Sequence, residues 1–185
     1  DSLMSIFKEI FARFRFWKYA DRLGPDIPSS HWKLYFPTLM RRLCKKKFLL
    51  FSDDAEFRPG AYAIGCSKIS IGRRVIIRPQ SMLFTDPREK GKGIIIEDDV
   101  MIGAGVHIYT HNHQFDNQDI PIINQGQYDS REVLIEKGSW IGANSIILPG
   151  VRIGINAIVG AGSIVIKDVP PKSIVLGSRA KIVKI

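Results

Sequence analysis

The stretch Ile135-Glu-Lys-Gly-Ser-Trp-Ile141-Gly-Ala-Asn-Ser-Ile-Ile147-Leu-Pro-Gly-Val-Arg-Ile153 repeats one pattern every six residues, and the pattern continues to Pro170. Each unit opens with an aliphatic residue and carries a small or β-branched residue four places later. A short fixed period is typical of a solenoid, in which each unit buries its apolar side chain only by stacking on the next turn. We therefore predict an all-β fold, a parallel β-helix with three units per turn, in which intervening Gly or Asn residues allow tight bends.

The same phase appears earlier in the chain, and its interruptions locate two insertions. The intervals from Leu83 to Ile96 and from Ile108 to Ile135 are not multiples of six residues. Extra chain must leave the coil in both, which predicts projecting loops at 85–93 and 109–131. Long excursions from a rigid scaffold often carry binding and catalytic groups.

Residues 1–55 lack the six-residue repeat and are predicted to form a helical lead-in. Apolar residues recur at helical spacing from Leu3 to Trp17, and basic residues occupy the other face. Two interpretations remain open: a helix docked on its own domain or a neighbouring subunit, and a helix lying on an anionic membrane. Residues 56–178 would form the β-helix, followed by a tail at 179–185.

Composition sets limits on location and partners. The formal charge of +9 suits an anionic partner, but Lys45-Lys46-Lys47 lacks the aromatic residues or fold motif of a nucleic-acid site, so no nucleic acid is expected. Two cysteines cannot form a disulfide framework, and no run of about 18 apolar residues is present. We expect a cytoplasmic protein, either free or at the inner face of the membrane.

Several motifs resemble those of the hexapeptide-repeat acetyltransferases. These are the loop Tyr109-Thr-His-Asn-His-Gln-Phe-Asp116, the later Trp140-Ile-Gly-Ala143, and the closing Val159-Gly-Ala-Gly-Ser-Ile-Val-Ile-Lys-Asp-Val-Pro-Pro171. Galactoside, maltose and xenobiotic acetyltransferases are similar, and the lead-in with Gly24-Pro-Asp-Ile-Pro28 resembles polysaccharide or lipopolysaccharide O-acetyltransferases. The resemblance implies a left-handed β-helix, a homotrimer with active sites between subunits, acetyl-CoA as the donor and no required metal.

The loop supplies the candidate catalytic base. A neutral imidazole can take a proton from an alcohol near pH 7, and the family pattern corresponds to His113, within Asn112-His113-Gln114-Phe115-Asp116. His111 is the second candidate, whereas His107 and His31 are interpreted as structural. The resemblance implies direct transfer of the acetyl group to a sugar or polysaccharide hydroxyl, with the backbone N–H of Ala143 facing the developing oxyanion.

The resemblance also implies a set of binding residues. The residues that it implies for acetyl-CoA are Trp140, Ala143, Ala161, Ile166, Lys167 and Lys181. For the carbohydrate acceptor the candidates are Asp86 and Asn112, because carboxylate and amide groups in the two loops suit a carbohydrate. The chain departs from the family at Ile166, where Thr is usual, and at Arg179, where Pro is usual.

Three alternatives stay open at this point. One is N-acetylation of an amino sugar, since an amine nucleophile also needs deprotonation. Another is a metal enzyme of the gamma-carbonic-anhydrase type, with His107, His111 and His113 as ligands. The last is a non-catalytic scaffold.

Overall fold

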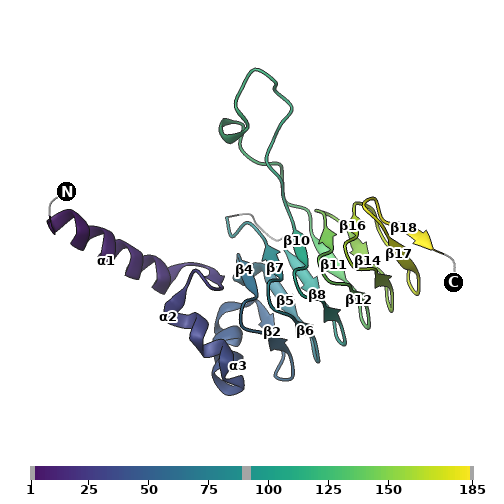
Figure 1. Cartoon of the computed structure of the whole chain (residues 1–185), viewed down its shortest axis with the longest axis horizontal. Coiled ribbons are helices and arrows are strands. Elements are labelled where there is room, and N and C mark those ends of the chain that lie inside the picture. The colour runs from purple at the N-terminus through teal and green to yellow at the C-terminus, as the bar shows by residue number, and fades with distance from the viewer. Residues whose placement is uncertain (1–2, 89–92, 184–185) are drawn as a thin grey trace.

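The computed structural model describes residues 3–88 and 93–183, and within these residues the chain winds into a prism with three sheets as its sides (Figure 1). Sheet A contains β1 (Arg22–Leu23), β4 (Tyr62–Ile64), β7 (Met82–Phe84), β10 (His107–Tyr109), β13 (Ile146–Ile147) and β16 (Ile164–Val165). Sheet B contains β2 (Leu50–Phe51), β5 (Ile69–Ile71), β8 (Ile94–Ile96), β11 (Val133–Ile135) and β14 (Arg152–Ile153). Sheet C contains β3 (Glu56–Phe57), β6 (Ile76–Ile77), β9 (Met101–Ile102), β12 (Trp140–Ile141), β15 (Ile158–Val159), β17 (Ile174–Leu176) and β18 (Lys181–Val183).

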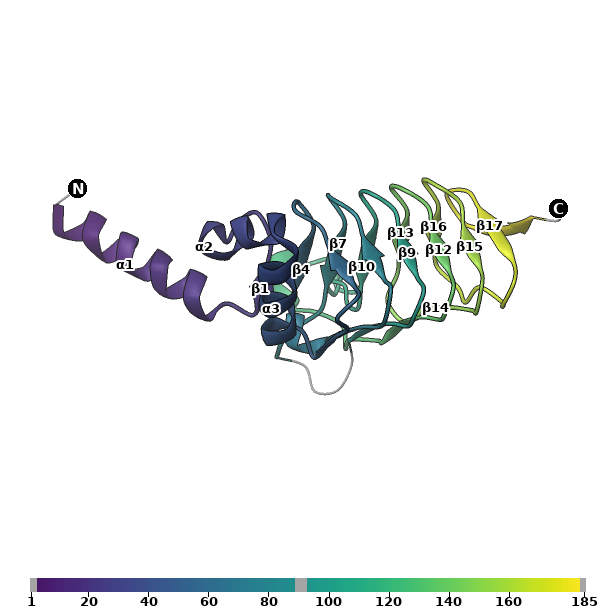
Figure 2. The ribbon, with the colours of Figure 1, turned by 90° about the horizontal axis from the view of Figure 1, so that it is seen from below.

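The strand register follows the six-residue repeat. Trp140 pairs with Ile158 and Ile146 pairs with Ile164, so each turn of the coil uses eighteen residues, or three units. The pairing is parallel throughout the coil, and successive turns stack along one axis (Figure 2). The antiparallel pairs are β1 with β4 and β17 with β18, at the two ends.

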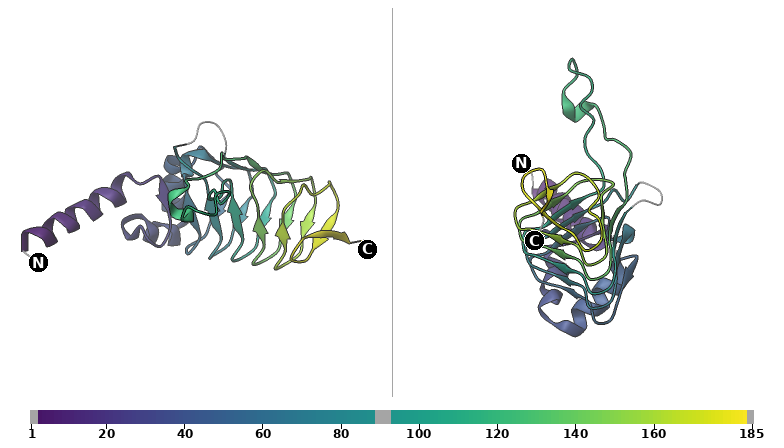
Figure 3. Two further views of the ribbon diagram at one scale, coloured as in Figure 1. Left: turned by 90° about the horizontal axis from the view of Figure 1, so that it is seen from above. Right: turned by 90° about the vertical axis from the view of Figure 1, so that its right-hand side faces the viewer.

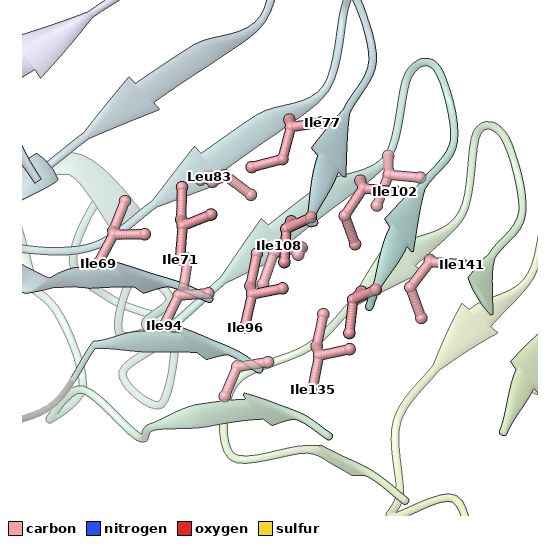
Figure 4. Packing of buried hydrophobic residues seen from close by; sticks show 14 of the residues in the cluster. Ile69, Ile71, Ile77, Leu83, Ile94, Ile96, Ile102, Ile108, Ile135 and Ile141 are labelled. Carbon is pink, nitrogen blue, oxygen red and sulfur yellow. The ribbon is translucent and has the colours of Figure 1, made fainter. Parts of the chain in front are cut away.

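The repeat positions take the roles predicted for them. The opening aliphatic residues point into the prism and are 0–1% exposed, among them Ile135, Ile141 and Val165; Figure 4 shows part of this core. The bend positions lie in the left-handed region of backbone conformation, with φ between 54° and 85°, at Gly138, Asn144, Gly150, Asn156 and Gly162. Only Gly and Asn occupy that region readily, which explains their spacing in the sequence.

The helices gather at the N-terminal end of the coil. They are α1 (Leu3–Tyr19), α2 (Pro28–His31), the 3₁₀ helix η1 (Trp32–Tyr35) and α3 (Pro37–Lys47); the 3₁₀ helices η2 (Cys66–Lys68) and η3 (Ile122–Asn124) lie further along. α3 buries Met40 and Cys44 against the first turn and so covers the open end of the core. α1 extends away from the prism (Figures 1 and 2, and the left view of Figure 3), contacts α2 and buries no residue, so it is not docked along the prism.

The ends of the coil differ from the predicted boundaries. Leu50 and Phe51 lie in the predicted lead-in, yet they pair with Ser70 and Ile71, so the coil begins before residue 56. In the predicted tail, Lys181 pairs with Leu176, which adds β18 to sheet C. The unit that begins at Phe51 opens with an aromatic residue in place of an aliphatic one, and β18 lies beyond the last six-residue unit and is ordered by pairing with β17.

Two further expectations concern cysteines and membrane spanning. Cys44 and Cys66 are both free and buried, and burial raises the pKa of the Cys66 thiol to about 12. Across the residues that the model describes, none of the helices combines the length and the apolar character that crossing a membrane requires.

Candidate active site

The two insertions leave the coil side by side. β7 and β10 are neighbours in sheet A, with Phe84 paired to Tyr109, and each insertion follows directly after its strand. Thr110 donates from its N–H to the Phe84 carbonyl at 3.1 Å, and Thr85 donates from Oγ1 to the Gly65 carbonyl at 2.8 Å. These bonds fix the bases of the two loops, so Asp86 and His111, each two residues beyond a paired residue, start next to one another. The central part of the first loop, 89–92, lies outside the described residues.

The second insertion is an ordered hairpin at the corner between sheets A and B, and it projects from the prism (Figures 1 and 3). The Arg131 N–H donates to the Thr110 carbonyl at 2.7 Å, and the Tyr128 N–H donates to the Asn112 carbonyl at 2.9 Å. His113 forms an isolated antiparallel bridge with Gln127. The backbone position of His113 is therefore set by cross-hairpin hydrogen bonding.

The hairpin tip is closed by one side chain. The Gln125 amide donates from Nε2 to the carbonyls of Asn117 and Ile120, each at 2.7 Å, and its Oε1 accepts from the Asn117 N–H at 3.1 Å. Since most tip side chains are exposed, this polar network takes the place of an apolar core in holding the tip.

His113 and Asp86 line one surface groove together with Arg88, Ile123, Gly126 and Gln127. Asp86 is only 6% exposed, and both of its carboxylate oxygens accept hydrogen bonds from the Arg88 guanidinium at 2.7–3.2 Å. The hydrogen bond from Arg88 is the main reason that the pKa of Asp86 falls to about 2. Arg88 Nη2 also donates to Gln127 Oε1 at 3.4 Å. The first loop is thus tied to the hairpin strand that bridges His113.

The second candidate histidine lies by a different groove. His111 and Asn112 line a surface with Phe115, Tyr128, Asp129, Arg131 and Pro149. Within it, the Phe115 and Tyr128 rings meet edge to face at 5.5 Å, and a hydrogen bond to the Asp116 carboxylate raises the pKa of Tyr128. His113 is the histidine that shares a groove with Asp86, whereas His111 shares one with Asn112.

The remaining histidines lie away from both grooves. The His107 imidazole on β10 lies 3.0 Å from the Tyr109 hydroxyl, and His31 packs edge to face against Tyr35, with its pKa lowered by burial. The described residues contain no group of three His, Cys, Asp or Glu side chains placed to hold a metal ion. Within the described residues of one protomer, the three histidines considered as metal ligands therefore do not converge.

The residues expected to bind acetyl-CoA fall at two different corners of the prism. Ala143 and Ala161 stack at the corner between sheets C and A, where the Gly162 N–H donates to the Ala143 carbonyl at 2.8 Å. Trp140 is on β12 before the same corner, and Lys181 pairs with Leu176 in sheet C. The other two residues, Ile166 and Lys167, lie between sheets A and B, the corner that carries the hairpin.

The exposed surfaces at these corners suit the chemistry of the donor. Trp140 is 47% exposed and Ile166 is 45% exposed, so both can contact a ligand, and Lys167 and Lys181 are exposed cations. CoA carries an apolar arm and anionic phosphates, so the residue types fit it.

Comparison with known proteins identifies similar chains. The model of the bacterial transferase hexapeptide (six repeats) matches residues 132–167, and that of the hexapeptide repeat of succinyl-transferase matches residues 91–110. Galactoside O-acetyltransferases of Lactococcus lactis and Escherichia coli are 32% and 30% identical, over 77% of this chain in each case. The chain carries the hexapeptide repeat of bacterial transferases and is similar to these acetyltransferases over most of its length.

The similarity extends to solved structures. A hexapeptide-repeat acetyltransferase of Vibrio cholerae, solved with acetyl coenzyme A, matches with a TM-score of 0.67 and 25% identity over 86% of this chain and 88% of that one. The predicted left-handed parallel β-helix with a helical N-terminal segment is thereby confirmed. The chain spans 65% and 66% of the length of the two galactoside O-acetyltransferases, just under two thirds.

Two residues of the groove were not foreseen from the sequence. Arg88 and Gln127 connect the two insertions, but each belongs to a different loop, and no repeat or motif relates them. The available signal was the adjacency of the two phase breaks, because insertions after neighbouring strands of one sheet must start side by side.

Proposed function

We propose that this hexapeptide-repeat protein transfers the acetyl group of acetyl-CoA to a hydroxyl of a sugar or polysaccharide, with His113 as the general base. The observation that carries the proposal is the placement of His113: it is bridged to Gln127 in an ordered hairpin and shares a groove with the Asp86–Arg88 pair. The names of the relatives add the acetyl donor and the O-acetyl product class.

The reaction needs one group that accepts a proton and one group that donates a hydrogen bond to the developing oxyanion. His113 takes the proton of the attacking hydroxyl while the oxygen adds to the thioester carbonyl carbon. The backbone N–H of Ala143 donates a hydrogen bond to the carbonyl oxygen as negative charge develops there. The carbon–sulfur bond then breaks, and His113 returns its proton to the leaving thiolate, so no covalent enzyme intermediate is needed.

The same proposal includes a homotrimer with sites between subunits. Its support is that the candidate site residues lie at two corners of the prism. Ala143 and Ala161 lie at one corner, and the hairpin with His113 lies at the next. A groove between two copies would bring the first corner of one copy against the hairpin of another. Trp140 and Ile166 would then contact the apolar arm of CoA, and Lys167 and Lys181 its phosphates.

The acceptor is assigned by polar groups in the two grooves. Arg88 holds Asp86 ionised and occupies both of its oxygens, so a sugar hydroxyl would use the lone pairs that remain, and Asn112 adds an exposed amide. Arg88 itself places a cation beside His113, which suits an acidic glycan.

One assay tests the activity and the acceptor class together. The protein is incubated with acetyl-CoA and separate panels of neutral sugars, acidic sugars and amino sugars, and thiol release is followed with and without each acceptor. We expect acceptor-dependent thiol release with a sugar hydroxyl. Release with amino sugars alone would assign N-acetylation, and no binding of acetyl-CoA in a calorimetric titration would refute the proposal.

A further inference from the structure

The helix α1 exposes more apolar surface than any function proposed above requires. None of its seventeen residues is buried. The exposed fractions are 71% for Leu3, 68% for Met4, 62% for Phe7, 71% for Phe11 and 60% for Phe14. Isolated exposed apolar residues are ordinary on a protein surface, but a contiguous apolar patch marks a site of contact. The described residues leave this helix uncovered, which points to a contact beyond them.

The apolar residues of α1 occupy one side of the helix. Spacings of three and four residues place Leu3, Phe7, Ile10, Phe14 and Trp17 along one line, and Met4, Ile6 and Phe11 beside it. Phe16 lies on the opposite side and packs against the guanidinium groups of Arg13 and Arg22. The helix is therefore amphipathic, with a broad and largely aromatic apolar face.

The charges of α1 are mostly positive: helical spacing places three of the cations at the borders of that face and Lys18 within it, in the last turn. The cations are Lys8, Arg13, Arg15 and Lys18, against the single acid Glu9. Lys and Arg can lay their hydrocarbon stems along apolar surface while the charged ends reach polar surroundings. A wide apolar face bordered by cations matches the boundary between acyl chains and anionic headgroups.

We propose that α1 docks the protein on an anionic lipid bilayer, lying in the plane of the membrane with its apolar face among the upper acyl chains. The aromatic rings provide most of the partition free energy, and the four cations select negatively charged headgroups. At seventeen residues with four cations, the helix is suited to lie on the bilayer and is too short and too charged to span it.

A second copy of the chain is a poorer occupant of the same face. Self-association through coiled-coil packing takes at least three to four heptads, whereas α1 offers about two. Its central line carries Phe7, Phe14 and Trp17, although Leu and β-branched residues are preferred in such seams. Parallel copies would also bring cations together with one acid each to pair them.

The proposal has a consequence for location, and this consequence rests on the proposed acetyl-transfer activity. α1 extends from the end of the prism that α3 covers (Figure 2), whereas the two insertions leave the coil after β7 and β10. Acetyl-CoA is a cytoplasmic metabolite, so an enzyme that uses it would dock on the cytoplasmic leaflet.

Vesicle co-sedimentation of the whole chain tests the proposal. The wild-type chain is mixed with vesicles of phosphatidylcholine alone, and with vesicles of phosphatidylcholine and phosphatidylglycerol in equal parts. Phe14→Ser removes a ring from the centre of the apolar face, and Phe16→Ser is the matched control on the opposite side of the same helix. The double variant Lys8→Glu/Arg15→Glu reverses two charges that border the face.

We expect the wild-type chain to bind anionic vesicles and to bind phosphatidylcholine vesicles weakly. Phe14→Ser should weaken anionic-vesicle binding about tenfold or more, and Phe16→Ser less than about threefold. The charge-reversal variant should abolish the preference for anionic vesicles, because each cation near the surface contributes about fivefold in binding.

Three outcomes would overturn the inference: no binding of the wild-type chain to anionic vesicles, equal losses for Phe14→Ser and Phe16→Ser, or a smaller assembly for Phe14→Ser in lipid-free sedimentation velocity. The last outcome would assign the face to another copy. As a control, the melting temperature of each variant should equal that of the wild-type chain, so that a loss of vesicle binding can be assigned to α1. Since binding is measured without a substrate, the result is separate from the assay of acetyl transfer.

Discussion

The coil and the hairpin inserted into it are stabilised in opposite ways. In the coil, every six-residue unit buries its opening aliphatic residue, so that Ile141 and Ile153 are 0% exposed. In the hairpin, Ile123 is 86% exposed, and the tip is held by the amide of Gln125. Substitutions in the coil should therefore change stability, whereas substitutions in the hairpin should change activity.

The largest expected effect is on catalysis. His113→Ala should lower kcat/KM for acetyl transfer by about a hundred- to ten-thousand-fold, the usual contribution of a general base. The melting temperature should stay unchanged, because the His113 side chain is exposed. His111→Ala is the comparison variant, and a larger loss of rate in it would move the catalytic role to His111.

A change in the coil gives the converse result. Ile141→Ala should lower the free energy of unfolding by about 3 kcal/mol, because it leaves a cavity between two stacked turns. The same truncation in the hairpin, Ile123→Ala, should change it by less than about 0.5 kcal/mol. Urea unfolding of the two variants measures the contrast, and comparable losses would show that the hairpin has a core of its own.

The stability contributed by the Asp86–Arg88 pair, where the first insertion meets the hairpin, should depend on pH. The pKa of Asp86 lies at about 2 in the folded protein, below its ordinary value of 3.8. The Asp86–Arg88 pair therefore stabilises the folded state at pH values above this ordinary pKa. That contribution should be lost as pH falls from about 4 to about 2. Asp86→Asn should therefore cost about 1–2 kcal/mol at pH 7, since Arg88 is largely exposed.

Thermal unfolding of the wild-type chain and Asp86→Asn across this pH range measures the difference. The melting temperatures should converge towards the acid end. A constant gap between them would mean that the carboxylate charge is not what matters at this position.

The smallest effect concerns the bends of the coil. Asn156 has φ of 54°, a conformation in which a side chain other than Gly, Asn or Asp is strained. Asn156→Ala should cost about 1 kcal/mol, and Asn156→Gly should be closer to neutral. If Ala were tolerated as well as Gly in thermal unfolding, the repeat of Gly and Asn would need another explanation.

The site was only partly accessible from the sequence. The phase breaks predicted the hairpin, and the resemblance nominated His113 and Asp86, which the structure brings into one groove. The roles of Arg88 and Gln127 were not predictable, because a hydrogen bond between two insertions depends on how both fold. The division of the acetyl-CoA residues between two corners was also hidden, since position in the repeat gives the stacking order but not the surface that a ligand uses.

The sequence by itself determined the coil. A six-residue period, with aliphatic residues inside and Gly or Asn at the bends, is satisfied by a stack of short parallel strands, and each unit depends only on its nearest neighbours in the stack. The tertiary structure decided what the non-repeating parts do. The Asp86–Arg88 pair, the bridge of His113 to Gln127 and the lack of buried residues in α1 each depend on contacts made or missing between distant segments. A local periodic pattern cannot encode them.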